Sequence, residues 1–444
     1  MFYLKKHFSN SALLLSTASF LLFNLFLSFS SYAGDFEYDQ NHMKYEDFTY
    51  DPNIKSVKLY RDGFSNSYPV LTLNNDTQQL HLSFDDLYGE VKDYGYQFIH
   101  CNKDWTPSDL SIFDFQTGPM DDMIREWAFS RIARQRYVHY DLHFPNDRIQ
   151  LTKSGNYLLI IKNYATGEVV ITRRFYITER NAISIDTRMK QATQGRYRLT
   201  HHEIDFDIIP IEYQINNPYT NLSVVIKQNN RSDNQKDELQ PVFVKSNMLT
   251  YDFDNENLFN GLNEFRFFDT RDLTYRALTT RITKTERDTF NVYLTDDINR
   301  STKQYVNYGD INGRYLIHRS ERRDSTTIDA QYVKVHFSLP HPAPLVNASV
   351  YLYGEFTNWQ ILPEFKLEYD EYYRSYNTSA FLKQGYYNYM YIYVKDGNPI
   401  GDATFFEGNH SDTENEYLFL VYHRKNSEFY DRLIGFHSEV FQKR

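Results

Sequence analysis

Residues 137–144 read Tyr-Val-His-Tyr-Asp-Leu-His-Phe, and this stretch decides the fold class. From Val138 to Phe144 every second residue is apolar, and His139, Asp141 and His143 fall between them. Because side chains on a β-strand point to opposite faces in turn, this alternation predicts a half-buried strand. One face of that strand should pack on a core, and the other should carry the histidines.

The same alternation recurs outward from this stretch in both directions. Further strands are predicted at residues 54–60, 80–84, 94–100, 155–161, 169–177, 204–208, 222–228, 249–253, 263–268, 333–337 and 386–394, and residues 348–359 are predicted as a strand that runs into a turn. Turn residues such as Pro145-Asn146-Asp147 separate them, which is typical of antiparallel sandwiches. Residues 121–136 alone favour a helix, with a long loop as the alternative.

Composition supports a mainly β chain. The 444 residues include 39 Tyr and 34 Phe, which favour pleated, half-buried surfaces. We therefore predict three tandem immunoglobulin-like or early-set antiparallel β-sandwich domains. Their expected bounds are an N-terminal sandwich at 44–178, a middle sandwich at 181–288, a linker at 289–331 and a C-terminal early-set-like sandwich at 332–444.

The N-terminus reads as an export signal. Lys5 and Lys6 precede an apolar run at residues 12–29, and Ser31-Tyr32-Ala33 offers small residues at a cleavage site. This order predicts a signal peptide, residues 1–33, that is cleaved on export. The alternative is an uncleaved anchor, because the run approaches the length that spans a bilayer.

Charge and cysteine content exclude several classes of protein. Cleavage after Ala33 would remove two lysines and no acidic residue, so the formal charge would change from −10 to −12. Such an acidic chain is unsuited to nucleic acid or to an anionic lipid surface. With one cysteine, Cys101, the chain has no internal disulfide.

Candidate chemical sites are few. His139, Asp141 and His143 would share a strand face, where they could bind zinc, although a solvated polar face is the simpler interpretation. His100 and Cys101 are adjacent and would point to opposite faces, so His100 should not activate the thiol. Phosphate-binding loops, Gly-x-Ser-x-Gly and His-Glu-x-x-His are missing from the sequence. We expect no enzyme, no metal, no cofactor and no small-molecule substrate.

Several ordered segments carry a family resemblance. They include His100-Cys101-Asn102-Lys103-Asp104-Trp105, and the full set is residues 54–60, 69–73, 82–87, 100–108, 137–146, 154–157, 173–175, 228–231 and 261–269. In this order they resemble the plug protein family of the type IX secretion system. The resemblance implies a soluble periplasmic protein that docks on the outer-membrane translocon barrel and occludes its periplasmic opening when no cargo is in transit.

A displaceable interface of this kind would use a few aromatic and arginine anchors. The candidate partner-binding residues are Trp105, Trp127, Arg125, Arg131, Arg134 and Arg136. The alternative is that both tryptophans belong to the core and that the arginines are merely solvated.

The C-terminal part carries a second resemblance, to glycogen-binding early-set domains. Residues 350–359, Val-Tyr-Leu-Tyr-Gly-Glu-Phe-Thr-Asn-Trp, carry it together with Gly385-x-Tyr387-x-Tyr389 and residues 395–397. Those domains stack sugars on two tryptophans with the help of a lysine. Trp359 matches the first tryptophan, residues 398–400 lack the second, and Met390 takes the lysine position. The alternative function is therefore a periplasmic glycan-binding protein that uses Trp359 and surface aromatics, although we expect a retained fold with a lost ligand.

Overall fold

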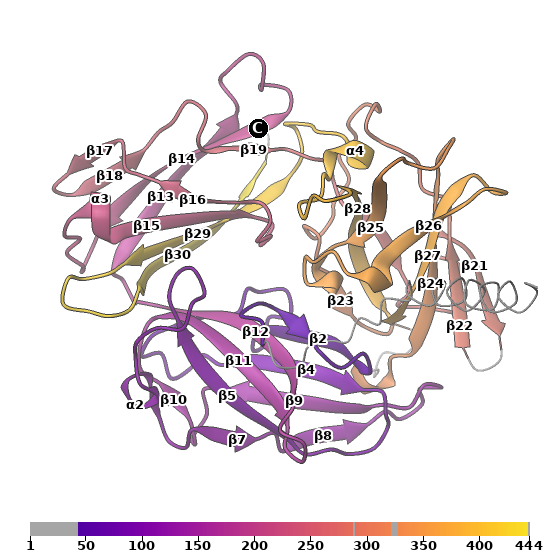
Figure 1. The fold of residues 1–444 in the computed structure, drawn as a ribbon, viewed down its shortest axis with the longest axis horizontal. Helices are drawn as coiled ribbons and strands as arrows, with labels where there is room; N and C mark the ends of the chain where they lie inside the picture. Colours follow the sequence, from indigo (N-terminus) through magenta and orange to yellow (C-terminus); the bar gives the residue numbers. More distant parts are fainter. Residues whose placement is uncertain (1–42, 287–288, 321–326, 443–444) are drawn as a thin grey trace, which may run out of the picture. The chain divides into compact units, whose positions relative to one another are not determined.

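The computed structural model describes residues 43–286, 289–320 and 327–442 (Figure 1). The predicted signal segment, residues 1–33, lies outside the described residues. Nearly half of the described chain forms strands, helices are few, and nearly all of the strand pairing is antiparallel, which confirms the mainly β prediction. Helices in the described ranges are single turns: α2 (Ile112–Phe115), α3 (Pro218–Asn221), α4 (Thr404–Glu407) and the 3-10 turns η1 (Thr327–Asp329), η2 (Glu355–Thr357) and η3 (Pro363–Phe365). Within those ranges, none is long and apolar enough to cross a bilayer.

The first sandwich packs two sheets around an aromatic core. One sheet has the order β1-β12-β11-β5-β7, with β3 beside β12: β1 (Phe48–Thr49), β12 (Val169–Thr178), β11 (Gly155–Asn163), β5 (Tyr94–Cys101), β7 (Asp121–Met123) and β3 (Val70–Thr72). The other has the order β2-β4-β9-β8: β2 (Ile54–Arg61), β4 (Leu80–Asp86), β9 (Val138–Phe144) and β8 (Glu126–Phe129). A short ladder joins β6 (Gln116–Thr117) to β10 (Gln150–Leu151). Phe84 on β4 lies 5.3 Å from Tyr94 on β5, so rings from both sheets meet in the core.

The middle sandwich is completed by the last strands of the chain. Its first sheet has the order β13-β14-β18-β17, with β19 on β14: β13 (Ile183–Gln191), β14 (His201–Pro210), β18 (Met248–Tyr251), β17 (Phe243–Lys245) and β19 (Leu258–Asn260). Its second has the order β16-β15-β29-β30: β16 (Gln235–Leu239), β15 (Leu222–Gln228), β29 (Asn415–His423) and β30 (Arg432–Phe441). Figure 1 shows β29 and β30 in yellow beside β15. Phe206 and Phe419 meet across the two sheets at 5.3 Å.

The third sandwich is one nine-stranded sheet that closes over its own core. The order is β20-β28-β25-β26-β27-β24-β22-β21, with β23 on β28: β20 (Arg266–Asp269), β28 (Gly385–Lys395), β25 (Ala348–Tyr353), β26 (Lys366–Asp370), β27 (Ser375–Lys383), β24 (Tyr332–Pro340), β22 (Thr289–Leu294), β21 (Thr280–Glu286) and β23 (Tyr315–Ile317). Phe268 on β20 lies 5.5 Å from Phe337 on β24, although four strands separate β20 from β24 in the sheet. The sheet therefore folds back on itself.

Strand pairing crosses the boundaries expected from the sequence. β20 and β21 fall within residues 181–288, and β22 and β23 fall within the expected linker, yet all four belong to the third sheet. β29 and β30 fall within residues 332–444, but β29 pairs with β15 of the middle sandwich and β30 pairs with β29. Consecutive strands usually neighbour each other in a sheet, but β20 pairs with β28 and β15 pairs with β29, which are distant in the sequence, so local patterning could not place them.

The helix predicted at residues 121–136 is wrong. This segment contains β7, which pairs with β5, and β8, which pairs with β9. Its Trp127 and Phe129 are two residues apart, which is the strand period and not the helical one. Tertiary pairing decided the local structure here.

A buried ion pair joins the first and third sandwiches. The Asp85 carboxylate on β4 lies 2.6 Å from the Lys383 ammonium on β27, and it also accepts a hydrogen bond from the Tyr332 hydroxyl at 2.7 Å. His139 Nδ1 lies 2.5 Å from the other Asp85 oxygen. Burial alone would raise the pKa of Asp85, but Lys383 and His139 outweigh it and hold that pKa below its usual range.

Candidate functional site

The edge strand β8 presents two exposed aromatic side chains. β8 ends its sheet, with β9 as its partner. Trp127 is 45% exposed and Phe129 is 53% exposed, and their rings meet edge to face at 5.5 Å. An edge strand with exposed rings offers both unpaired backbone groups and apolar surface to a partner.

The loop after β8 is fixed to the third sandwich. Arg131 Nη2 lies 2.7 Å from the Asp329 carboxylate, and the Arg131 backbone N–H donates to Ile328. The guanidinium of Arg134 lies over the Phe290 ring at 4.3 Å. Two of the predicted anchor arginines therefore position this loop within the chain.

The other two arginines differ in their surroundings. Arg125 forms a two-pronged ion pair with Asp122, with N–O distances of 2.7 and 2.8 Å. Arg136 is exposed, and its side chain forms no ion pair with the part of the chain that the structure describes. The exposed side chains Trp127, Phe129, Ile132 and Arg136 are named the β8 surface below, and Ile132 is 47% exposed.

Trp105 lies away from the β8 surface. It follows β5 in the other sheet and is half-buried, with a φ of 68° that bulky residues rarely adopt. Arg174 lies 4.2 Å over its ring, and Tyr176 packs against it at 5.5 Å. Together with Lys227 and other residues of the middle sandwich it lines a cavity of about 450 Å³. The structure therefore does not bring the two predicted tryptophans together.

The predicted strand face with His139, Asp141 and His143 divides into two environments. His139 is buried against Asp85 and Asp141. Burial would lower its pKa, but hydrogen bonds with both carboxylates outweigh this and raise the pKa to about 9. At neutral pH His139 is therefore a cation inside a salt-bridge network and has no lone pair to offer a metal.

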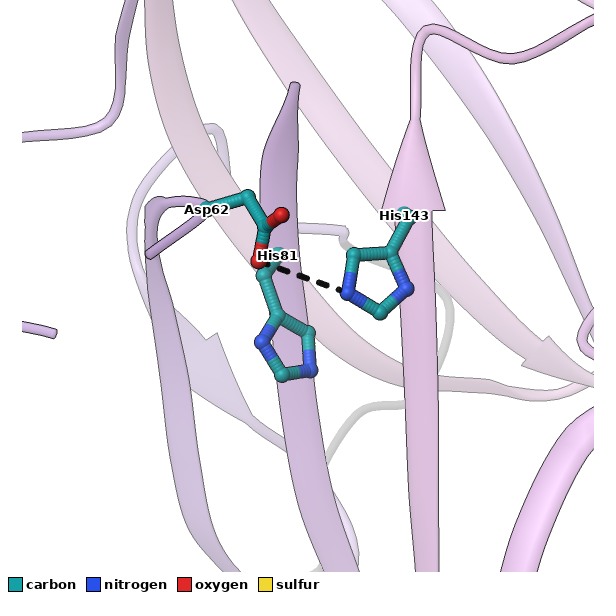
Figure 2. Close-up of side chains that lie close together, drawn as sticks. All are labelled: Asp62, His81 and His143. Carbon is teal, nitrogen blue, oxygen red and sulfur yellow. Dashed lines mark ion pairs between the residues drawn. The ribbon is translucent and has the colours of Figure 1, made fainter. Parts of the chain in front are cut away.

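His143 instead joins a half-exposed cluster with Asp62 and His81 (Figure 2). One ligand atom from each of the three lies within 4.8 Å of the others. His81 comes from β4, His143 from β9 and Asp62 from the turn after β2. Sequence reasoning missed Asp62 and His81 because the three residues meet only through the pairing of separate strands. The alternation at residues 80–84, which places His81 on the polar face, was the available signal.

The single cysteine is not an activated nucleophile. Cys101 is fully buried, and burial raises the pKa of its thiol to about 12. Neighbouring His100 binds the Ser108 hydroxyl and the Ser154 carbonyl. Burial also lowers the pKa of His100 to about 4. The thiolate form that nucleophilic chemistry needs is therefore strongly disfavoured.

Trp359 is packed within the third sandwich. Its ring contacts Tyr353 at 5.5 Å and Phe265 at 5.9 Å, and the Arg231 guanidinium lies 5.8 Å from it. Met390, at the position of the family lysine, is 2% exposed. These contacts engage the ring that a sugar would need as a stacking platform.

In a comparison with known protein families, one family model matches a segment that corresponds to the first sandwich. Residues 54–179 match the family model for the type 9 secretion system plug protein 1st domain. A hypothetical protein from Parabacteroides merdae ATCC 43184 is similar over 90% of this chain and 100% of its own, with 30% identity and a TM-score of 0.86. The C-terminal domains of antigen I/II-family proteins from Streptococcus pyogenes and Streptococcus agalactiae have TM-scores of only 0.14 and 0.13 at 5% and 7% identity, over 87% of this chain and 99% of theirs. No curated protein matches the chain.

Proposed function

This chain belongs to the type 9 secretion system plug protein family, and we propose that it is a non-enzymatic plug in the periplasm. It docks on the periplasmic opening of the outer-membrane translocon barrel and occludes that opening when no cargo is in transit. The observation that carries the proposal is the match of residues 54–179 to the first domain of such plugs. That domain is the first sandwich, which also carries the β8 surface.

We assign docking to the β8 surface. Interfaces depend on a few aromatic anchors at their centre, and Trp127 with Phe129 forms such a pair on an unpaired edge. The loop behind them is held by the Arg131–Asp329 ion pair and by Arg134 on Phe290, so little ordering is needed on binding. Such a small contact can be displaced by arriving cargo.

Occlusion needs bulk and rigidity more than reactive groups. The Asp85–Lys383 pair and its hydrogen bonds tie the first sandwich to the third. Lys58 adds a second tie, because its ammonium lies 2.9 Å from the Glu355 carboxylate. These contacts support a plug that binds to the translocon opening and leaves it as one rigid body.

Co-purification with the translocon tests this proposal. The chain should be recovered with the outer-membrane barrel in detergent, and its deletion should make the outer membrane permeable to large antibiotics when cargo traffic is blocked. If the immobilised chain retains oligosaccharide but never the barrel, the glycan-binding alternative is correct. Unchanged permeability under those conditions would refute occlusion. The packing of Trp359 against Tyr353 and Phe265 disfavours the glycan-binding alternative.

A further inference from the structure

We propose that Asp62, His81 and His143 form a binding site for a divalent transition-metal ion, with Zn²⁺ as the cation that fits them best. Ligand atoms of these three side chains already lie within 4.8 Å of one another. Figure 2 shows Asp62 facing His143, with 3.6 Å between its Oδ1 and Nε2 of the ring. Zinc–ligand bonds of about 2.0–2.2 Å require these groups to move closer together and reorient when the cation binds.

The scaffold holds two of the three ligands firmly. His81 and His143 lie on the paired strands β4 and β9, where they are directly opposite each other in the register. Their rings stack with centroids 4.2 Å apart and planes 20° apart, so a ring must turn about its side-chain torsions before both lone pairs point at one cation. Asp62 is held in its turn because its backbone N–H donates to the Gln79 carbonyl at 2.9 Å. A site built on paired strands is preorganised in a way that a loop site is not.

A carboxylate orients His81 as outer-shell carboxylates orient metal-binding histidines. Asp141 Oδ1 lies 2.6 Å from His81 Nε2, so the Nε2 proton is directed to Asp141 and Nδ1 keeps its lone pair. Nδ1 now pairs with the Tyr60 hydroxyl at 2.9 Å. A cation would take this lone pair, and the hydroxyl would turn away from it.

Further donors and solvent complete the surroundings. Glu126 Oε2 lies 3.6 Å from His143 Nδ1, on the side of the ring away from Asp62, and can orient that ring. The exposed side-chain fractions are 49% for Asp62, 30% for His143 and 15% for His81, so an ion can enter and a water can fill the remaining position. Glu126 also belongs to β8, but it pairs with Asp141 while Trp127 pairs with Tyr140, so the metal site and the exposed rings of β8 lie on opposite faces of the sheet.

The kinds of ligand atom at this site determine which cations can bind to it. Two imidazoles and a carboxylate suit Zn²⁺ and its transition-metal neighbours. Ca²⁺ and Mg²⁺ prefer a shell of oxygen atoms, and this cluster supplies too few. The proposal stands on these residues and is independent of whether the chain occludes a translocon.

The test is zinc uptake by the purified chain without a polyhistidine tag. Equilibrium dialysis against ZnSO₄ should give one equivalent per chain, and excess Mg²⁺ should leave this uptake unchanged. His143→Ala and Asp62→Asn should each weaken binding at least about tenfold, as loss of a ligand or of its support does at known sites. His437→Ala is the matched control, because His437 also faces a carboxylate, Glu439 at 3.3 Å, and should bind zinc as the unaltered chain does.

Three results would overturn the site. They are no stoichiometric uptake, uptake that survives both His143→Ala and Asp62→Asn, and displacement of zinc by Mg²⁺. Both altered side chains are partly exposed, so circular dichroism should show folded variants. X-ray absorption on the zinc-loaded chain gives an independent reading, and two imidazole ligands are expected there. A spectrum with oxygen ligands alone would also refute the proposal.

Discussion

Asp85 and Lys383 form an ion pair across the contact between the first and third sandwiches, with 2.6 Å between Oδ2 and Nζ and with side chains 0% and 1% exposed. The two residues are 298 positions apart in the chain. Tyr137 supports the pair, because the Lys383 ammonium lies 4.3 Å from its ring centroid. This pair joins two separate sheets, alongside the Lys58–Glu355 and Arg131–Asp329 ion pairs.

Asp85→Asn should lower the free energy of unfolding substantially. The variant keeps the size of the side chain but leaves the Lys383 ammonium buried without its counter-charge, which costs about 3–5 kcal/mol. Urea denaturation followed by fluorescence measures this cost. Asp296→Asn is the control, because its pair with Arg281 is more than half exposed on both sides and should contribute less than about 1 kcal/mol. Equal losses in both variants would contradict the proposed role of burial.

Stability should fall as pH rises above neutrality, because of His139. Its pKa in the folded chain is about 9, above the ordinary value of about 6.5. Its contribution is therefore complete below pH 6.5 and is lost as pH rises through 9, with a maximum of about 3 kcal/mol. Asp85, Asp141 and Lys383 are the charged groups that face it.

Urea denaturation between pH 6 and pH 10 checks this prediction. His139→Gln should lose the part of the pH dependence that belongs to this residue, so the difference between the two proteins is the quantity to read. Parallel curves for the two proteins would show that His139 does not titrate in this range.

Trp127→Ala combined with Phe129→Ala should abolish most translocon binding. Central aromatic anchors each contribute about 2 kcal/mol or more, so the recovered complex should fall at least about tenfold. Tyr372→Ala with Tyr373→Ala is a matched control, because those rings also meet edge to face, at 4.9 Å, and are 86% and 73% exposed. If both double variants bind equally well, docking uses another surface. The measurement is quantitative co-purification from detergent extracts.

Trp359→Ala should destabilise the third sandwich without altering glycan retention. Its ring packs on Tyr353 and Phe265, and loss of a half-buried indole should cost about 2–3 kcal/mol. Tyr372→Ala, at an 86% exposed position, should change stability by less than about 0.5 kcal/mol. Thermal melting gives the first quantity, and retention on immobilised oligosaccharide gives the second. If the unaltered chain is retained specifically on oligosaccharide and the Trp359→Ala variant is not, the result would support the glycan-binding alternative.

Cys101→Ala should leave translocon binding and membrane permeability unchanged. The thiol is buried with a raised pKa, so it should also react far more slowly with Ellman's reagent in the folded chain than in urea. Rapid labelling of the folded chain, or loss of function in the variant, would point to thiol chemistry.

Local patterns predicted the strands well but not their partners. Residues 138–144 form β9 as the alternation indicated, with Val138, Tyr140 and Phe144 in the core. This succeeded because the two-residue period is a property of the strand itself. The partner of β15 is instead β29, nearly 200 residues later, and no local signal specifies such a pairing.

For the candidate sites, too, the sequence indicates local features but not contacts between distant strands. Trp127 and the arginines near it are contiguous in sequence, so composition could single them out, although only the structure shows that Arg131 and Arg134 are engaged within the chain. The cluster of Asp62 and His81 with His143 depends on the register of separate strands. Its geometry could not be predicted without the sheet.

Because β29 and β30 return to β15, the third sandwich is connected to the middle one by two chain crossings, one on each side. A domain joined at both ends cannot swing on a single hinge. During synthesis the middle sandwich also stays unfinished until β29 and β30 have been made. Truncation near residue 415 would therefore damage a domain whose other strands were made some two hundred residues earlier.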